Sequence, residues 1–206
     1  MNLILCAMDR LWTPWRYSYV IGAQTHDRKG VPADLAGWPG EDHHCVFCNL
    51  NAAVVWGLTE GIPNALAAGH VIARLESCFI CLNAYPYSSG HLLVLPYRHT
   101  DSLAKLDPSE AQELMRTMQS LDSVLREVYC PDGINVGMNL GEAAGAGVAG
   151  HLHIHILPRW FGDTNFMTVT AETRVLPETL DVTWNRLKEA FDKIDAPRRS
   201  EQITKA

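Results

Sequence analysis

The stretch His151-Leu152-His153-Ile154-His155-Ile156-Leu157 alternates three histidines with branched apolar residues. Such alternation is typical of a β-strand, in which successive side chains point to opposite faces. We therefore expect the three imidazoles on one face, with Leu152, Ile154 and Ile156 facing a core. Imidazole titrates near neutral pH, binds metals and attacks phosphorus or carbonyl centres, so this strand is predicted to form an active-site wall. The alternative is a surface strand that carries histidines by chance.

Length and charge narrow the class of protein. The chain has 206 residues, which favours one domain with extensions. A net charge of −6 disfavours a nucleic-acid partner, which usually requires a basic face, but it leaves room for a small anionic ligand. Because no apolar run is long enough to span a bilayer, no membrane partner is expected. Residues 3–8 are apolar but lack a basic region before them, so we predict no signal peptide and a cytoplasmic location.

The domain organisation follows from composition. Residues 1–44 are predicted to be an irregular N-terminal extension that packs on the domain, because several Trp and Tyr residues precede a Gly-, Pro- and Asp-rich stretch. Residues 45–195 form the domain, and residues 196–206 are a polar tail. The apolar residues at 51–66 follow no clear period, so no element is predicted there.

The secondary structure indicates an α+β fold. The segment Asp107-Pro108-Ser109-Glu110 is a strong helix start, and apolar residues at spacings of three and four follow it to Val128. A second helix is expected from about Pro177 to Asp195. Strands and helices mix without a regular βαβ repeat, which favours an antiparallel sheet of about five strands with two main helices. The predicted strands are Val71–Leu75, Phe79–Leu82, His91–Pro96, Ile134–Leu140 and His151–Pro158.

A glycine-rich loop, Gly141–Gly150, leads into the histidine strand. Gly145, Gly147 and Gly150 allow the backbone to approach a ligand closely and to direct amide groups at an anion. Beside three imidazoles, this loop is predicted to cradle phosphate. The alternative is a flexible hairpin.

Cys45-Val46-Phe47-Cys48 offers half of a tetrahedral zinc site, because its two thiolates are two residues apart. The other half must come from elsewhere in the chain. His99 and one histidine of the strand are the obvious candidates, although His43 and His44 lie next to Cys45. The alternative is a reduced pair that binds no metal.

The second pair with this spacing is Cys78 and Cys81, and the chain has six cysteines in all. This pair falls in a predicted core strand, where residues three apart face opposite ways. We therefore expect two buried free thiols there. Asn83 follows the same strand and enters a turn rich in Pro and Gly. It is either a turn residue or an amide that binds a ligand hydroxyl.

Together these segments resemble the histidine triad superfamily of nucleotide hydrolases and transferases. The triad motif, in which three histidines alternate with apolar residues, is met in full by residues 151–157. The segment Gly90–His99 matches the upstream strand signature, and the CxxC pair is similar to that of the zinc-containing branch. The segments Arg10–Arg16 and Pro158–Met167 resemble bacterial members described as diadenosine tetraphosphate phosphorylases. The resemblance covers roughly residues 9–195.

The resemblance implies a role for each candidate residue. His153 would be the nucleophile that takes up the nucleotide, and His155 would bind phosphate and help the leaving group. Asn83 would bind ribose, and Asn139 would lie near the phosphates together with Gly145 and Gly147. The implied ligands of a structural zinc are Cys45, Cys48, His99 and His151. Homodimerisation is a further expectation of the family.

The implied activity is cleavage of dinucleoside polyphosphates such as diadenosine tetraphosphate, with inorganic phosphate as acceptor and ADP and ATP as products. Hydrolysis of nucleoside phosphoramidates or of adenylyl sulfate is an alternative that uses the same residues. A sugar-phosphate nucleotidyltransferase fits less well, because that branch ends its motif in Gln where this chain has His155. Gly147 departs from the polar side chain that relatives often carry there, which leaves a non-catalytic nucleotide-binding protein as a third reading.

Overall fold

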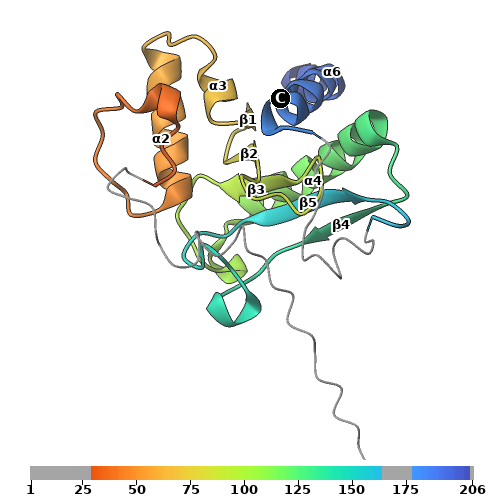
Figure 1. The fold of residues 1–206 in the computed structure, drawn as a ribbon. Helices are drawn as coiled ribbons and strands as arrows, with labels where there is room; N and C mark the ends of the chain where they lie inside the picture. The colour runs from red at the N-terminus through yellow and green to blue at the C-terminus, as the bar shows by residue number, and fades with distance from the viewer. Residues whose placement is uncertain (1–28, 164–177, 205–206) are drawn as a thin grey trace, which may run out of the picture.

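The computed structural model describes residues 29–163 and 178–204. In this part of the chain, five antiparallel strands form one sheet in the order β1-β2-β3-β5-β4 (Figure 1). The strands are β1 (Val71–Arg74), β2 (Cys78–Leu82), β3 (Leu92–Pro96), β4 (Gly133–Gly137) and β5 (Ile154–Arg159). The prediction of an α+β fold with about five antiparallel strands is confirmed.

Helices cover both faces of this sheet. In Figure 1, α2 and α3 lie to the left of β1–β3, and α4 and α6 lie to the right. The α-helices are α2 (Val46–Thr59), α3 (Ala65–Ala68), α4 (Pro108–Tyr129) and α6 (Leu180–Thr204). Short 3-10 turns, η1 (Ala33–Leu35), η2 (Leu103–Lys105) and η3 (Glu142–Ala144), lie in the connections.

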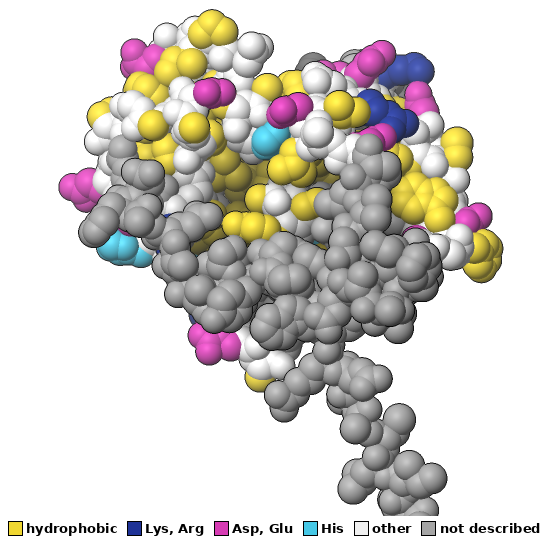
Figure 2. All heavy atoms as spheres, in the orientation of Figure 1, with side chains coloured by type: hydrophobic (Ala, Val, Ile, Leu, Met, Phe, Trp, Pro, Cys, Tyr) yellow, Lys and Arg dark blue, Asp and Glu magenta, His cyan; other side chains and the backbone are white. Residues whose placement is uncertain are grey.

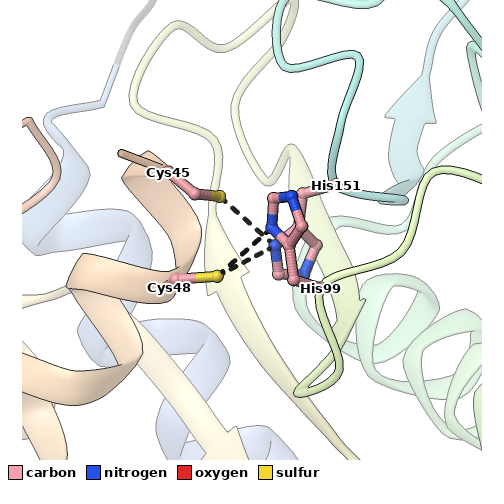
Figure 3. Close-up of side chains that lie close together, drawn as sticks. All are labelled: Cys45, Cys48, His99 and His151. Atoms are coloured by element: carbon pink, nitrogen blue, oxygen red, sulfur yellow. Dashed lines mark hydrogen bonds between the residues drawn. The ribbon is translucent and has the colours of Figure 1, made fainter. Parts of the chain in front are cut away.

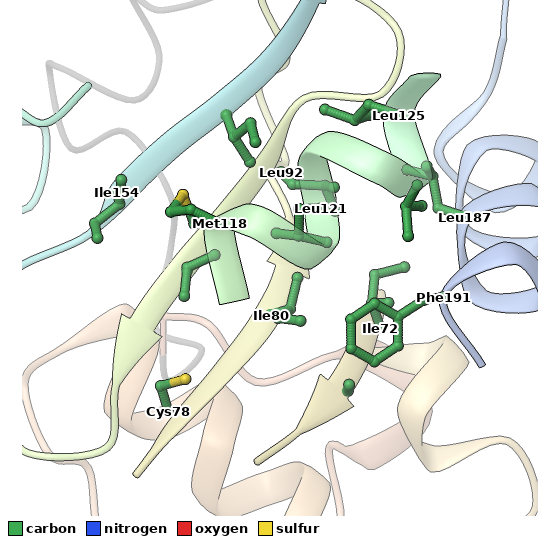
Figure 4. Close-up of a cluster of buried hydrophobic side chains, with 14 of the residues drawn as sticks. Ile72, Cys78, Ile80, Leu92, Met118, Leu121, Leu125, Ile154, Leu187 and Phe191 are labelled. Atoms are coloured by element: carbon green, nitrogen blue, oxygen red, sulfur yellow. The ribbon is translucent and has the colours of Figure 1, made fainter. Parts of the chain in front are cut away.

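The strands divide their side chains between two cores. One core lies between the sheet and helices α4 and α6, and Figure 4 shows Ile80 and Leu92 there against Leu121 and Phe191. Leu152, Ile154 and Ile156 belong to this core, as predicted. The other core lies between the sheet and α2, and it contains Phe79, Cys81, Leu93 and Leu95. His155 pairs in register with Leu93 and therefore faces the α2 side.

The predicted start of α4 is confirmed. The backbone N–H of Asp107 donates to the Glu110 carboxylate at 2.8 Å, and Pro108 occupies the first helical position. Leu114, Leu121 and Leu125 are buried on the face that meets the sheet. The apolar spacing therefore marked the buried face of this helix correctly.

The structure differs from the expected elements in three places. A full helix, α2, occupies part of the 51–66 region where none was predicted. Its apolar residues lie on several sides because it contacts α3 and η1 as well as the core, so no single-face period is visible. The second difference is in the bounds of two elements: β4 is shorter than predicted, and α6 continues to Thr204, past the expected end at Asp195.

The third difference concerns the histidine strand. β5 begins at Ile154, so His151 and His153 precede the paired part of the strand. The last β3–β5 pair joins Val94 to Ile154, and Leu152 donates its N–H to Thr100 O at 2.6 Å instead. The backbone stays extended there, but the first two histidines lie beside the segment that follows β3.

The cysteines of β2 are buried free thiols, as predicted. Cys78 lies in the core beneath α4, and Cys81 lies in the core beneath α2. Burial raises the pKa of each thiol to about 12, which keeps both protonated at neutral pH. They are therefore packing residues.

Candidate active site and metal centre

His153 presents one ring nitrogen to a cavity on the α2 side of the sheet. Its Nδ1 lies 2.7 Å from the carbonyl oxygen of His151. A carbonyl oxygen only accepts, so Nδ1 carries the proton and Nε2 keeps a lone pair. Burial lowers the pKa of His153, which favours the neutral imidazole. A neutral ring with a fixed Nε2 lone pair is the form required of a nucleophile.

His155 has the opposite tautomer, which is set by Tyr87 and His91, two residues of the segment before β3. The backbone N–H of Tyr87 donates to Nδ1 of His91 at 3.0 Å. A neutral His91 therefore carries its proton on Nε2, which lies 2.9 Å from Nδ1 of His155. Nδ1 of His155 is then the acceptor, and a neutral His155 carries its proton on Nε2. The two histidines thus offer an acceptor and a donor side by side, with ring centroids 5.0 Å apart.

His91 is a site residue to which we assigned no role from the sequence. It is buried, with 1% of its surface exposed, and its ring centroid lies 5.1 Å from that of His155. Phe47 was missed in the same way: its ring lies 5.2 Å from His153 and 5.6 Å from His151. Both residues fall inside segments singled out for other reasons, the upstream strand and the CxxC pair. Their contacts depend on tertiary packing and carry no local signal.

The cavity has a volume of about 290 Å³. Apolar side chains form much of it, and Figure 2 shows a hollow with hydrophobic walls on the face drawn in Figure 1. Six residues predicted to touch a nucleotide line it: Asn83, Asn139, Gly145, Gly147, His153 and His155. The remaining walls include Val31, Val46, Leu50 and Leu93. A cavity of this kind suits a flat apolar group with a polar end near the histidines.

Asn83 is a turn residue that also lines the cavity. Its Oδ1 accepts from the backbone N–H of Tyr85 at 3.0 Å, which is a turn contact. Its Nδ2 lies 3.4 Å from Nδ1 of His91, and the residue also lines the cavity. The turn therefore fixes the amide at the cavity wall.

The glycine-rich loop folds as the turn η3 followed by Gly145, whose φ is +88°. Residues other than glycine rarely adopt this backbone conformation. The Asn139 Nδ2 lies 3.5 Å from the Gly145 carbonyl oxygen and links the segment after β4 to the loop. The loop and Asn139 thus form a polar part of the cavity wall.

A second cluster gathers the four residues implied as zinc ligands: Cys45, Cys48, His99 and His151 (Figure 3). Their ligand atoms lie within 4.8 Å of one another. The measured S···N distances are 3.3 Å (Cys45–His151), 3.4 Å (Cys48–His99) and 3.5 Å (Cys48–His151). Zinc–sulfur and zinc–nitrogen bonds of about 2.3 and 2.0 Å place neighbouring ligand atoms roughly 3.5 Å apart in a tetrahedron. The four residues therefore fit one zinc ion.

The tautomer of His151 also fits a metal. Its Nε2 donates to the Pro96 carbonyl oxygen at 3.0 Å, so Nδ1 directs its lone pair at the two sulfurs. Burial lowers the pKa of His151 to about 4, which keeps the ring neutral. Burial and the neighbouring Cys45 raise the pKa of Cys48 to about 12, so two thiolates here require a cation.

Asn49 holds the part of the N-terminal extension that the structure describes, which begins at Lys29, beside the cavity. This fully buried amide in α2 donates to the Lys29 carbonyl oxygen at 2.9 Å and to Asp42 at 2.7 Å. It also accepts from the His43 backbone at 2.9 Å. Gly30–Pro32 consequently line the cavity. Neither His43 nor His44 belongs to the metal cluster.

No helix in residues 29–163 and 178–204 is long and apolar enough to cross a membrane.

The chain is similar in sequence to known proteins over most of its length. The family model described as "HIT domain" matches residues 65–162. An AP-4-A phosphorylase of Mycobacterium tuberculosis (strain ATCC 25618 / H37Rv) is 38% identical over 173 residues, covering 84% of this chain and 79% of that relative. A bis(5'-nucleosyl)-tetraphosphatase [asymmetrical] of Schizosaccharomyces pombe is 35% identical over 86 residues, or 42% of this chain and 46% of that one.

Among solved structures, a Zn-bound histidine triad family protein from Mycobacterium smegmatis is similar, with a TM-score of 0.55 and 27% identity. That match covers 74% of this chain and 96% of the other. Family model, sequence relatives and fold agree with the histidine alternation. The chain belongs to the histidine triad (HIT domain) family.

Proposed function

We propose that this protein is an enzyme that cleaves dinucleoside polyphosphates, diadenosine tetraphosphate first, through a nucleotidyl-histidine intermediate. The observation that carries the proposal is the pair of opposite tautomers at one cavity wall. His153 offers a lone pair on Nε2, and His155 offers a proton on its own Nε2. A nucleophile beside a hydrogen-bond donor for the leaving group is the arrangement that suits displacement at phosphorus. The relatives' names support the substrate class.

The first step forms a bond from Nε2 of His153 to the α-phosphorus of one nucleotide. The bond from that phosphorus to the bridging oxygen breaks, and ATP leaves from diadenosine tetraphosphate. The Nε2–H of neutral His155 donates a hydrogen bond to the departing oxygen and stabilises the charge that develops on it. In the second step an acceptor attacks the same phosphorus, the phosphorus–nitrogen bond breaks, and His153 is released as neutral imidazole.

The cavity walls suggest how the substrate lies. The base fits against the apolar residues of the α2 side, where Val46 and Leu50 face the cavity. Asn83 would bind the ribose, and Asn139 would lie beside the phosphates. At Gly145 and Gly147 only backbone groups are available to the phosphate oxygens, which suits a glycine-rich anion site. The missing side chain at Gly147 removes one donor but neither histidine.

Replacing Asn83 by alanine should weaken binding of ribonucleotide substrates by about tenfold, the loss typical of a hydrogen-bonded polar group. A carboxamide both donates and accepts, so it can bind a vicinal diol. KM for diadenosine tetraphosphate and for its 2′,3′-dideoxy analogue is the measurement, and the analogue should be nearly unaffected. Equal losses for the two substrates would assign Asn83 to the turn alone.

Zinc is proposed as the metal of the Cys45, Cys48, His99 and His151 cluster. The relative of known structure described as Zn-bound supports this choice, and so do the soft ligands and their spacing. Two thiolates and two imidazoles complete a tetrahedron with no open position, so the ion would brace the structure. It would join α2 to the loop after β3 and to the start of the histidine segment.

Inorganic phosphate is proposed as the acceptor, because the closer relative is named a phosphorylase. The second anion would bind the polar wall of the glycine-rich loop. Arg16 or Arg159 could offset the charge of this anion. Arg159 already forms an ion pair with Asp163 and a hydrogen bond with Asn135. Arg16 lies outside the described residues. None of the cavity-lining residues in the described ranges is Lys or Arg.

We expect ADP and ATP from diadenosine tetraphosphate when phosphate is present, with labelled phosphate incorporated as the β-phosphate of ADP. Attack of phosphate on nucleotidyl-His153 places the label there and nowhere else. Chromatography of the nucleotides after reaction with and without phosphate is the measurement. A rate independent of phosphate, with AMP as a main product, would instead make the enzyme a hydrolase.

Two expectations of the family remain proposals. A homodimer would form along β4, which is an edge strand in the described sheet and exposes 55% of Val136. A cytoplasmic location agrees with the free thiols of Cys78 and Cys81.

A further inference from the structure

Tyr87 contacts His91 and His155 in two ways. Its backbone N–H donates to Nδ1 of His91 at 3.0 Å. Its ring centroid lies 4.6 Å from that of His91. The Tyr87 and His155 ring centroids are 5.9 Å apart, and these two rings are only 22° from parallel. Tyr87 also lines the cavity. Tyr87 therefore donates a hydrogen bond to His91, and its ring contacts the imidazoles of both His91 and His155.

The backbone on each side of Tyr87 is anchored. Before it, the Tyr85 N–H donates to Oδ1 of Asn83 at 3.0 Å. After it, the Ser88 hydroxyl donates to the Pro158 carbonyl oxygen at 3.1 Å. Gly90 follows with a φ of +78°, and a Cβ there would lie 2.7 Å from the Tyr129 ring. Between these anchors, the ring and the backbone N–H of Tyr87 both tie the loop to the histidines.

The ring also restricts how His155 can turn. A 180° rotation of an imidazole about its χ2 angle places Cδ2 where Nδ1 was and Cε1 where Nε2 was. For His155 this rotation would move Nδ1 away from His91 and turn the Nε2 proton away from the cavity. A nearly parallel aromatic ring hinders the rotation, whereas a smaller aliphatic side chain leaves space for it.

We propose that Tyr87 is a positioning residue that holds His155 as the Nε2–H tautomer with this proton directed at the departing phosphate oxygen. The proposal deepens the proposed function and rests on it for its kinetic consequence. Tyr87 touches none of the reacting atoms and acts through His91 and His155. The proton stays on His155, and its hydrogen bond stabilises the charge on the leaving oxygen as the phosphorus–oxygen bond breaks, so no other reactant is needed.

The kinetic test compares leaving groups of graded acidity. Adenosine 5′-phosphate aryl esters are suitable, because a poor leaving group such as phenolate depends more on a hydrogen bond to its oxygen than p-nitrophenolate does. In Tyr87→Leu, kcat for the phenyl ester should fall by about tenfold or more, as expected for a misaligned hydrogen-bond donor. The p-nitrophenyl ester should lose much less, and KM should change little. Tyr87→Phe keeps the ring and should restore most of the lost rate.

Tyr97→Leu is the matched control. Tyr97 is also a half-buried aromatic residue, but its ring stacks on Phe79 at 5.9 Å in the α2 core. This variant should show no dependence of its rate on the leaving group beyond that of the wild type. Equal losses for all esters in Tyr87→Leu, or a loss confined to KM, would overturn the proposal.

A second measurement does not depend on activity. In the zinc-loaded protein with ¹⁵N-labelled histidine, the nitrogen shifts report which ring nitrogen of each histidine carries the proton. Wild type and Tyr87→Phe should show His155 as the Nε2–H tautomer, and Tyr87→Leu should show a mixture. An unchanged tautomer in Tyr87→Leu would reject the proposal. A wild type that cleaves no nucleotide would reject the proposed function, and the NMR result would still decide the role of Tyr87.

Discussion

His153→Ala should abolish turnover, with a loss in kcat of at least about 10³-fold, while the fold stays intact. Removal of a covalent nucleophile eliminates the first step, and what remains is catalysis by binding and by the other groups. The side chain is buried, but its hydrogen bond to the His151 carbonyl oxygen is local. Loss of this hydrogen bond should lower the free energy of unfolding by only about 1–2 kcal/mol. Circular dichroism and thermal melting would establish that the variant is folded.

The decisive measurement is covalent labelling. The wild type, mixed with a substrate labelled in the α-phosphate and quenched in a single turnover, should carry label that is stable to base and lost in acid, as expected for a phosphorus–nitrogen bond. His153→Ala should carry none. His44→Ala is a suitable control, because that side chain is 90% exposed. Near-normal turnover, or label retained in His153→Ala, would remove His153 as the nucleophile.

The sequence predicts this part of the site well because strand alternation is a local property. Apolar residues at 152, 154 and 156 face one core, so the histidines between them must face the other side. The tautomer of His153 is also set locally, by the His151 carbonyl oxygen. The tautomer of His155 is not local, because it depends on His91 and on the Tyr87 N–H that fixes His91. Residue types alone therefore identify the histidines but cannot tell the nucleophile from the donor to the leaving group.

The role of His91 could have been inferred only with the register of the strands. Leu93 pairs with His155, and His91 lies two residues before Leu93 on the same face. This places His91 diagonally beside His155, within reach of a hydrogen bond. Without the pairing of β3 with β5, His91 is one more residue at the start of a strand. The helix α2 escaped prediction for a related reason: it is apolar on several sides because tertiary contacts surround it.

The metal cluster shows the same division between local and tertiary information. The CxxC spacing predicts two ligands, and the structure shows why it places them together. Cys45 is the N-cap of α2, and Cys48 lies in the first turn of that helix. The spacing does not say which histidines complete the set. His99 and His151 meet the sulfurs because β3 ends at Pro96 and the histidine segment crosses that end, where Pro96 accepts from His151.

Loss of the metal should have a large effect on stability. We expect the protein purified without chelator to contain one zinc per chain, and Cys45→Ala/Cys48→Ala to contain none. The ion would join segments that are distant in sequence, so its binding free energy would contribute to folding. A loss of even about 3 kcal/mol would lower the melting temperature by roughly 6–12 °C in a chain of this size. Metal analysis and thermal melting measure the two effects.

The second CxxC pair provides the control. Cys78→Ala/Cys81→Ala removes two thiols of the same spacing from the core, so it should cost some stability and leave the zinc content at one per chain. Zinc retained by Cys45→Ala/Cys48→Ala, or absent from the wild type, would reject the assignment. The effect on rate should be much smaller than that of His153→Ala. The cluster reaches His153 only indirectly, through Phe47 and through the carbonyl oxygen of His151. A metal that braces those two contacts should tune the alignment of the nucleophile without taking part in the chemistry.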